Sequence, residues 1–137
     1  MKTEGQLSSS GPVNVRHLQL LNFGPNKDVF PPDKASFLSL IEEMHNWQEQ
    51  QKDSQNHKIN DKMIIHCMDG VTRSGLFCGA SHIIQQINLN QEVDPFMAAR
   101  YVSIRRQQFF QTQEEYNFLF NIGLEYMSRN HDYVEVE

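Results

Sequence analysis

The chain has 137 residues and a formal net charge of −5. This length suits one domain or part of one, and the acidic balance argues against a nucleic-acid partner. Two cysteines form no disulfide framework and fit a reducing compartment, and neither a membrane-spanning apolar run nor a signal peptide is recognised.

The N-terminal part of the chain is predicted to contain a lead-in, a strand and a loop. Residues 1–12 are polar and rich in Ser and Gly, which is typical of a disordered segment. Residues 13–21 alternate loosely between apolar and polar side chains and predict a β-strand. A loop containing prolines follows, and Asp33 at its end is a good N-cap for the next helix.

The middle of the chain is predicted to form a helix, a linker, a buried strand and a second helix. Apolar residues recur at helical spacing over residues 35–52. A polar linker follows over residues 53–60. The short apolar run at residues 63–65 predicts a buried strand, and the next helix is expected over residues 74–87.

Two further helices are predicted from their capping residues. Asp94 suits the N-cap of a helix over residues 94–106, because proline follows it at the first helical position. Thr112 opens a helix over residues 112–129, and Glu115 three residues later completes a capping box.

The segment that carries the chemistry is residues 62–75, with the sequence KMIIHCMDGVTRSG. Cys67 ends the predicted strand, and Arg73 precedes the predicted helix. Backbone N–H groups in such a loop converge on one oxyanion. The helix N-terminus and the guanidinium both favour the thiolate of Cys67, and Arg73 can contact two phosphate oxygens at once. The alternative is that Cys67 is only a buried thiol at a strand end.

The string His66-Cys67, five residues, Arg73-Ser74-Gly75 resembles the signature H-C-S-A-G-x-G-R-[ST]-G of the cysteine-dependent protein tyrosine phosphatases. The resemblance implies that Cys67 is the nucleophile, that Arg73 binds phosphate and that His66 favours the thiolate. For His66 alone, a histidine satisfied at a strand end is the alternative. The implied phosphate loop consists of Cys67, Met68, Asp69, Gly70, Val71, Thr72 and Arg73.

Two residues of this loop depart from the family pattern. Asp69 stands where the family has alanine, and a carboxylate there repels a phosphate dianion. Thr72 stands where the family has glycine, and a β-branched residue fits poorly if the position needs a positive φ. Both departures predict weakened phosphate chemistry.

Two other loops of the family resemble parts of this chain. Asn26, in Gly24-Pro25-Asn26, occupies the position of the general acid and cannot donate a proton, and general acid catalysis contributes about 10²–10⁴-fold. Asp28 is the alternative acid if the loop is shifted. Gln111 matches the first of two glutamines that position the hydrolytic water, with an ordinary polar loop residue as the alternative. Glu115 replaces the second glutamine.

The resemblance also implies the fold. It predicts an α/β fold, a twisted mixed sheet flanked by helices, with the phosphate loop between a strand and a helix. The partial domain would span residues 13–129, followed by an acidic tail at residues 130–137. It matches the C-terminal half of the family's domain.

This combination of residues looks like the second, membrane-distal domain of receptor-type tyrosine phosphatases. The resemblance implies weak or absent phosphotyrosine hydrolysis and a regulatory or binding role. The implied partners are a catalytic phosphatase domain or a phosphotyrosine protein, in the cytoplasm or the intracellular part of a membrane receptor. No cofactor is implied. The alternatives are an active phosphatase using Cys67 and a redox-sensing thiol oxidised at Cys67.

The remaining histidines lack any tight ligand spacing, so no metal site is predicted. The group of Arg100, Arg105 and Arg106 is interpreted as a solvated helix face, with attraction of an acidic partner or phosphopeptide as the alternative.

Overall fold

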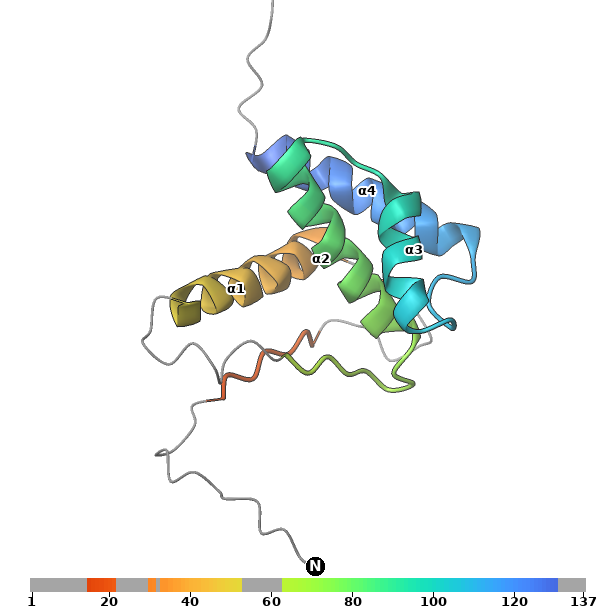
Figure 1. The fold of residues 1–137 in the computed structure, drawn as a ribbon. Helices are drawn as coiled ribbons and strands as arrows, with labels where there is room; N and C mark the ends of the chain where they lie inside the picture. The colour runs from red at the N-terminus through yellow and green to blue at the C-terminus, as the bar shows by residue number, and fades with distance from the viewer. Residues whose placement is uncertain (1–14, 22–29, 32, 53–62, 131–137) are drawn as a thin grey trace, which may run out of the picture.

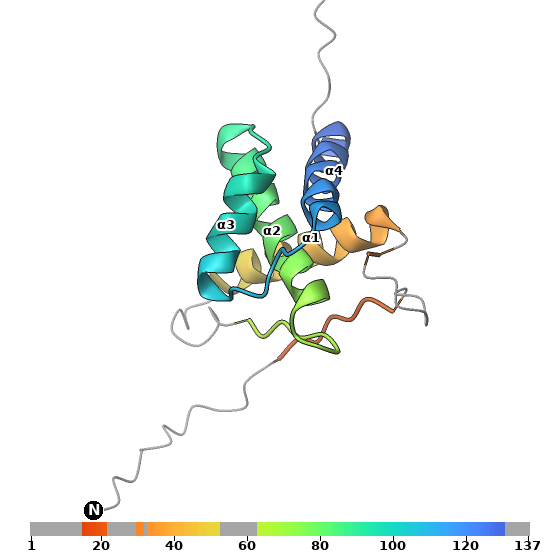
Figure 2. The ribbon, with the colours of Figure 1, turned by 90° about the vertical axis from the view of Figure 1, so that its right-hand side faces the viewer.

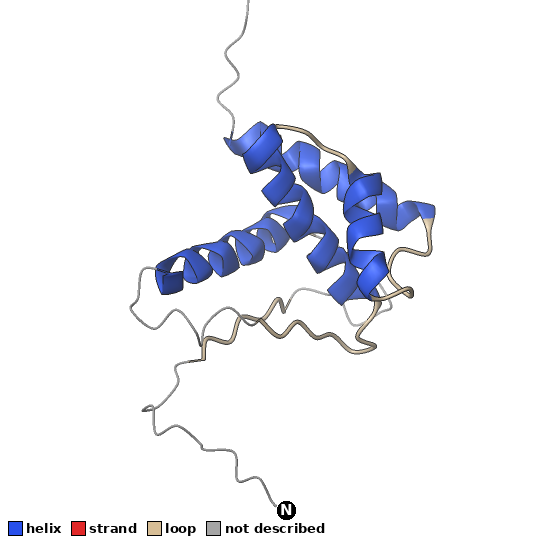
Figure 3. Ribbon diagram, in the orientation of Figure 1, coloured by secondary structure: helices blue, strands red, loops and turns tan. Residues whose placement is uncertain are grey.

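The computed structural model describes residues 15–21, 30–31, 33–52 and 63–130 (Figure 1). These residues form four α-helices, shown in blue in Figure 3. All four were predicted, with ends that differ from the prediction by up to three residues. Their bounds are α1 (Lys34–Lys52), α2 (Thr72–Asn90), α3 (Pro95–Arg105) and α4 (Gln113–Asn130).

Some predictions fall outside the described residues. These are the lead-in at residues 1–12, the loop that contains Asn26 and Asp28, the linker at residues 53–60 and the tail from residue 131 onward. They stay predictions.

The prediction of an α/β fold with a twisted mixed sheet is wrong. The described part of the chain is helical and contains no strand. Residues 15–21 and 63–67 run beside one another below the helices in Figures 1 and 2, and they have no regular secondary structure. The apolar run at residues 63–65 is not buried as predicted, since Met63 is 43% exposed and Ile64 is 90% exposed. An apolar run is compatible with an extended segment, whereas a strand also needs a hydrogen-bonding neighbour. The sequence pattern contains no information about that neighbour.

Local side-chain hydrogen bonds explain where α3 and α4 begin. The Asp94 side chain accepts a hydrogen bond from the Met97 amide at 3.0 Å, and proline occupies the first turn, as predicted. The Thr112 hydroxyl accepts from the Glu115 amide at 3.3 Å. The carboxylate of Glu115 accepts a hydrogen bond from the Gln111 amide at 3.2 Å. In a capping box it would accept from the Thr112 amide, so this box is wider by one residue.

Helix α2 lies at the centre of the fold and packs against both α3 and α4, while α4 also contacts α1. Its side chains Ile83 and Ile87 are 0% exposed, and Ile84 is 1% exposed. Burying an aliphatic side chain of this size contributes about 1.5–3 kcal/mol. The core is therefore built around the helix that begins at the end of the candidate phosphate loop.

An aromatic cluster joins α1, α2 and α4. The Phe37 ring lies 6.0 Å from the Phe77 ring and 5.5 Å from the Phe118 ring, and both pairs are close to edge-on. Such edge-to-face pairs contribute about 0.5–1.5 kcal/mol beyond the area that they bury. This cluster fixes the first turn of α1 against the N-terminal half of α2.

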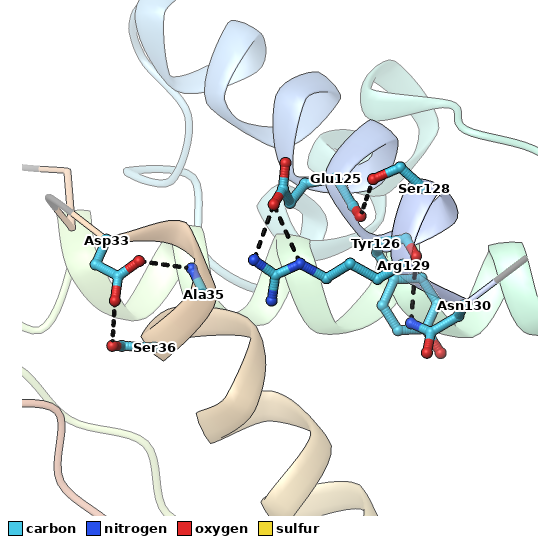
Figure 4. A network of polar contacts seen from close by, with 8 residues as sticks. All are labelled: Asp33, Ala35, Ser36, Glu125, Tyr126, Ser128, Arg129 and Asn130. Carbon is cyan, nitrogen blue, oxygen red and sulfur yellow. Dashed lines mark hydrogen bonds and ion pairs between the residues drawn. The ribbon is translucent and has the colours of Figure 1, made fainter.

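The beginning of α1 lies beside the end of α4 (Figure 4). Asp33 caps α1 as predicted, because its two carboxylate oxygens accept from the Ala35 amide at 3.0 Å and the Ser36 hydroxyl at 2.6 Å. These bonds, that from Ser36 first, lower the pKa of Asp33, and the charge of Arg129 acts in the same direction. Arg129 also pairs with Glu125 at 2.8 Å.

Candidate active site

The predicted phosphate loop connects the extended residues 63–67 to α2. Gly70 has a φ of 67°, which glycine adopts without steric cost. Thr72 does not have a positive φ and is instead the first residue of α2. The expectation that Thr72 would strain the loop is therefore wrong, because the left-handed position falls two residues earlier, on Gly70.

The Asp69 carboxylate is the centre of hydrogen bonding in this loop. Its Oδ1 accepts from the Val71 amide at 2.9 Å and from the Thr72 amide at 3.1 Å. Its Oδ2 accepts from the Thr72 hydroxyl at 3.0 Å. These bonds satisfy donors at the N-terminal end of α2, whose first turn has no partners within the helix. Asp69 thus binds the start of the helix from inside the loop.

The Cys67 thiol also donates to Asp69, with 3.3 Å between Sγ and Oδ1. The pKa of Asp69 is well below its usual range, first because of the Val71 amide, then because of the Cys67 thiol and the Thr72 donors. Asp69 is solvent-exposed and charged at neutral pH. The loop therefore holds a permanent negative charge beside the candidate nucleophile.

Four predicted site residues line one groove of about 980 Å³, whose apolar wall includes Trp47 and Phe77. They are His66, Cys67, Met68 and Arg73. Cys67 and Arg73 are half-buried, whereas His66 is exposed. The structure thus brings together the thiol and the guanidinium that the spacing of the motif had linked.

Gln111 is exposed and is held within its own connection between α3 and α4. Its side-chain amide donates to the Gln107 carbonyl at 2.8 Å, and its backbone amide donates to Glu115. It is not among the described residues that line the groove. The predicted water-positioning role of Gln111 remains a prediction, as does the role of Asn26, which lies outside the described residues.

Two residues beside the loop were missed by the sequence analysis. A Cβ atom built on Gly70 would lie 3.6 Å from Arg106 Nη1, and one built on Gly75 would lie 3.0 Å from Phe109 Cδ1. The Arg106 guanidinium also lies over the Phe109 ring, 5.8 Å from its centroid. The connection after α3 therefore packs against the loop and the first turn of α2. Gly75 was the available signal, since it marks the close approach of Phe109, whereas Gly70 is in ordinary contact with Arg106.

Arg100 and Arg105 lie on α3, and Arg106 directly follows it. All three are exposed, which agrees with the predicted solvated face. Within the described residues, no cluster of three or more His, Cys, Asp or Glu side chains is arranged to hold a metal ion.

A sequence model of one family, described as Protein-tyrosine phosphatase, matches residues 2–125 of the chain. The match covers most of the chain and includes the loop from Cys67 to Arg73. The chain belongs to the protein-tyrosine phosphatase family. The family resemblance predicted from the motif is thereby confirmed.

Similar proteins are receptor-type tyrosine phosphatases. The chain is 32% identical over 117 residues to receptor-type tyrosine-protein phosphatase U of Gallus gallus, which covers 85% of this chain and 8% of that protein. It is 30% identical over 103 residues to receptor-type tyrosine-protein phosphatase alpha of Homo sapiens, which covers 75% of this chain and 12% of that protein. It is 27% identical over 119 residues to tyrosine-protein phosphatase Lar of Drosophila melanogaster, which covers 87% of this chain and 6% of that protein.

The chain thus spans 6–12% of the length of these three relatives. None of its described helices combines the length and apolarity needed to cross a bilayer.

Proposed function

We propose that this chain is a tyrosine-phosphatase domain with weak or no phosphotyrosine hydrolysis, which acts as a regulatory or binding module in phosphotyrosine signalling. The observation that carries the proposal is the hydrogen bond from the Cys67 thiol to the Asp69 carboxylate. A cysteine attacks phosphorus as the thiolate. The carboxylate that accepts this hydrogen bond holds its negative charge 3.3 Å from the sulfur, where it repels the phosphate dianion that the sulfur has to reach.

A second departure supports weak turnover. Asn26 occupies the general-acid position by resemblance, and an amide cannot protonate the leaving phenolate. General acid catalysis contributes about 10²–10⁴-fold, so its loss lowers the rate separately from the repulsion of phosphate by Asp69.

By resemblance, we propose a catalytic phosphatase domain or a phosphotyrosine protein as the partner. The receptor-type relatives support a place on the cytoplasmic side of a membrane receptor.

Hydrolysis of p-nitrophenyl phosphate under reducing conditions tests the proposal. We expect the chain to release nitrophenol at most slightly faster than its Cys67→Ser variant. Cys78→Ser is the matched control, because it removes the other thiol of the chain while leaving the loop intact. Turnover as fast as that of an active tyrosine phosphatase assayed beside it, lost in Cys67→Ser and retained in Cys78→Ser, would contradict the proposal, provided that both variants keep the helical circular dichroism of the parent.

The alternative is an active phosphatase, favoured by the placement of Cys67 and Arg73 in one groove. In that case the Cys67 thiolate attacks phosphorus, the ester P–O bond breaks, and the phenolate leaves and takes a proton from water. Water then hydrolyses the thiophosphate to release phosphate and restore the thiol.

Restoring the family's residues at positions 26 and 69 tests whether these two departures account for the weak or absent hydrolysis. Asn26→Asp combined with Asp69→Ala should raise the rate above that of the parent. Thr72 is left unchanged, because it begins α2 and needs no glycine. A double variant as inactive as the parent would show that these two residues do not explain the loss.

A further inference from the structure

The loop of this chain uses its anion-binding donors internally. A phosphate bound between Cys67 and α2 would need the N–H groups at the start of that helix. The amides of Val71 and Thr72 already donate to one oxygen of Asp69, and the Thr72 hydroxyl donates to the other. A carboxylate therefore sits where those donors converge.

A second anion cannot share this position. Phosphate oxygens and the Asp69 carboxylate would compete for the same N–H groups, and two negative charges at contact distance repel each other. The cations nearby do not remove this conflict. Arg73 lines the adjoining groove and Arg106 lies against Gly70, yet neither supplies the backbone donors that Asp69 has taken.

We propose that the Asp69 carboxylate is a built-in occupant of the phosphate loop, which excludes phosphate and phosphotyrosine until Asp69 is displaced or neutralised. The proposal rests on the proposed function, since it concerns the same loop, and it extends that function from turnover to binding. It makes Asp69 a specificity-determining residue. It also follows that the module recognises its partner through a surface other than the phosphate loop.

Ordinary helix capping is the competing explanation, and the chain contains a matched control for it. Asp94 caps α3 through the Met97 amide at 3.0 Å, at a site that contains no thiol or phosphate loop. Asp69 differs in accepting from two backbone amides, a hydroxyl and the Cys67 thiol together. If capping were its whole role, neutralising Asp69 and neutralising Asp94 would have the same effect on anion binding.

Titration with inorganic phosphate, followed by ³¹P NMR at neutral pH, tests the proposal. Asp69→Asn removes the charge. Its neutral amide oxygen can still cap the helix and keep the fold, but it accepts these hydrogen bonds more weakly than a carboxylate does, so phosphate can displace it. We expect at least roughly tenfold tighter phosphate binding by Asp69→Asn than by the parent, because one like charge is removed from the position of the ligand. Asp94→Asn should bind phosphate as weakly as the parent. The double variant Asp69→Asn with Arg73→Gln should bind phosphate as weakly as the parent.

Three results would overturn the proposal. These are equal phosphate affinity in the parent and Asp69→Asn, an equal gain in Asp94→Asn, and a gain that survives Arg73→Gln. Phosphate is not hydrolysed, so this titration is independent of turnover. Equal affinity without fast turnover would refute only the proposal that Asp69 occupies the loop. Cys67-dependent turnover by the parent as fast as that of an active tyrosine phosphatase would refute the proposed function.

Discussion

Replacing Gly123 with alanine should destabilise the fold, although alanine is the better helix former. Gly123 is buried in α4. A Cβ atom there would lie 2.6 Å from Val93 Cγ1 and 3.1 Å from Ile83 Cγ2. Valine has a stiff χ1, and Ile83 is 0% exposed, so neither side chain can turn away at low cost. The missing side chain is what lets α4 approach α2.

The expected magnitude is the difference between two opposing effects. Alanine in a helix interior gains about 1 kcal/mol over glycine, and overpacking a core costs about 1–3 kcal/mol. We therefore expect Gly123→Ala to lower the free energy of unfolding by about 1 kcal/mol, with the overpacking cost outweighing the helical gain. Urea unfolding followed by circular dichroism at the helical band measures this change. Asn121→Ala, at an exposed position of the same helix, is the control and should not destabilise.

Removing the clashing methyl groups should rescue the variant. In Gly123→Ala with Val93→Ala, the new Cβ occupies the space that the valine methyls leave, so the loss should be smaller than the sum of the two single losses. The reasoning would be refuted if Gly123→Ala were more stable than the parent, as an open helical site would make it. Strict additivity of the two substitutions would refute it as well.

The remaining predictions concern a carboxyl, a thiol and a phenol. The Val71 amide and other donors lower the pKa of Asp69, so the unfolded chain binds more protons than the folded chain below about pH 4. The free energy of unfolding should therefore fall as the pH drops below about 4. Asp69→Asn should flatten this part of a plot of urea midpoint against pH. Burial raises the pKa of Cys78, so iodoacetamide in mildly alkaline buffer should modify it faster in urea than in the folded chain; equal rates, by mass spectrometry on Cys67→Ser, would contradict this. Tyr126→Phe removes a 2.8 Å hydrogen bond to the end of α2 and should cost about 0.5–1.5 kcal/mol in urea unfolding, whereas an unchanged midpoint would show that the bond contributes nothing.

The helices were predictable because their signals are local. Asp33 and Asp94 cap helices within three residues of themselves, and Thr112 does so with Glu115. Each hydrogen bond joins groups that are close in the sequence, so the residues that make it can be recognised together. The observed helix ends differ from the predicted ends by up to three residues, and all four predicted helices are present.

The candidate site was predictable in part. The spacing of Cys67 and Arg73 predicted that they share one anion site, and they do line one groove. The role of Asp69 was predicted as repulsion alone, because the amides it binds become known only when the start of α2 is known. Thr72 was expected to fit poorly if its position needed a positive φ, and the positive φ belongs to Gly70.

The sequence by itself determined the four helices, their caps and the loop that joins a cysteine to an arginine. The tertiary structure decided that residues 63–67 form no strand in the described part of the chain. It also decided that Arg106 lies beside Gly70 of the loop and Phe109 beside Gly75 of α2. The reason is the range of the interactions. Helical hydrogen bonds connect residues four apart, whereas strand pairing and loop packing depend on segments distant in the chain, whose approach no local pattern encodes.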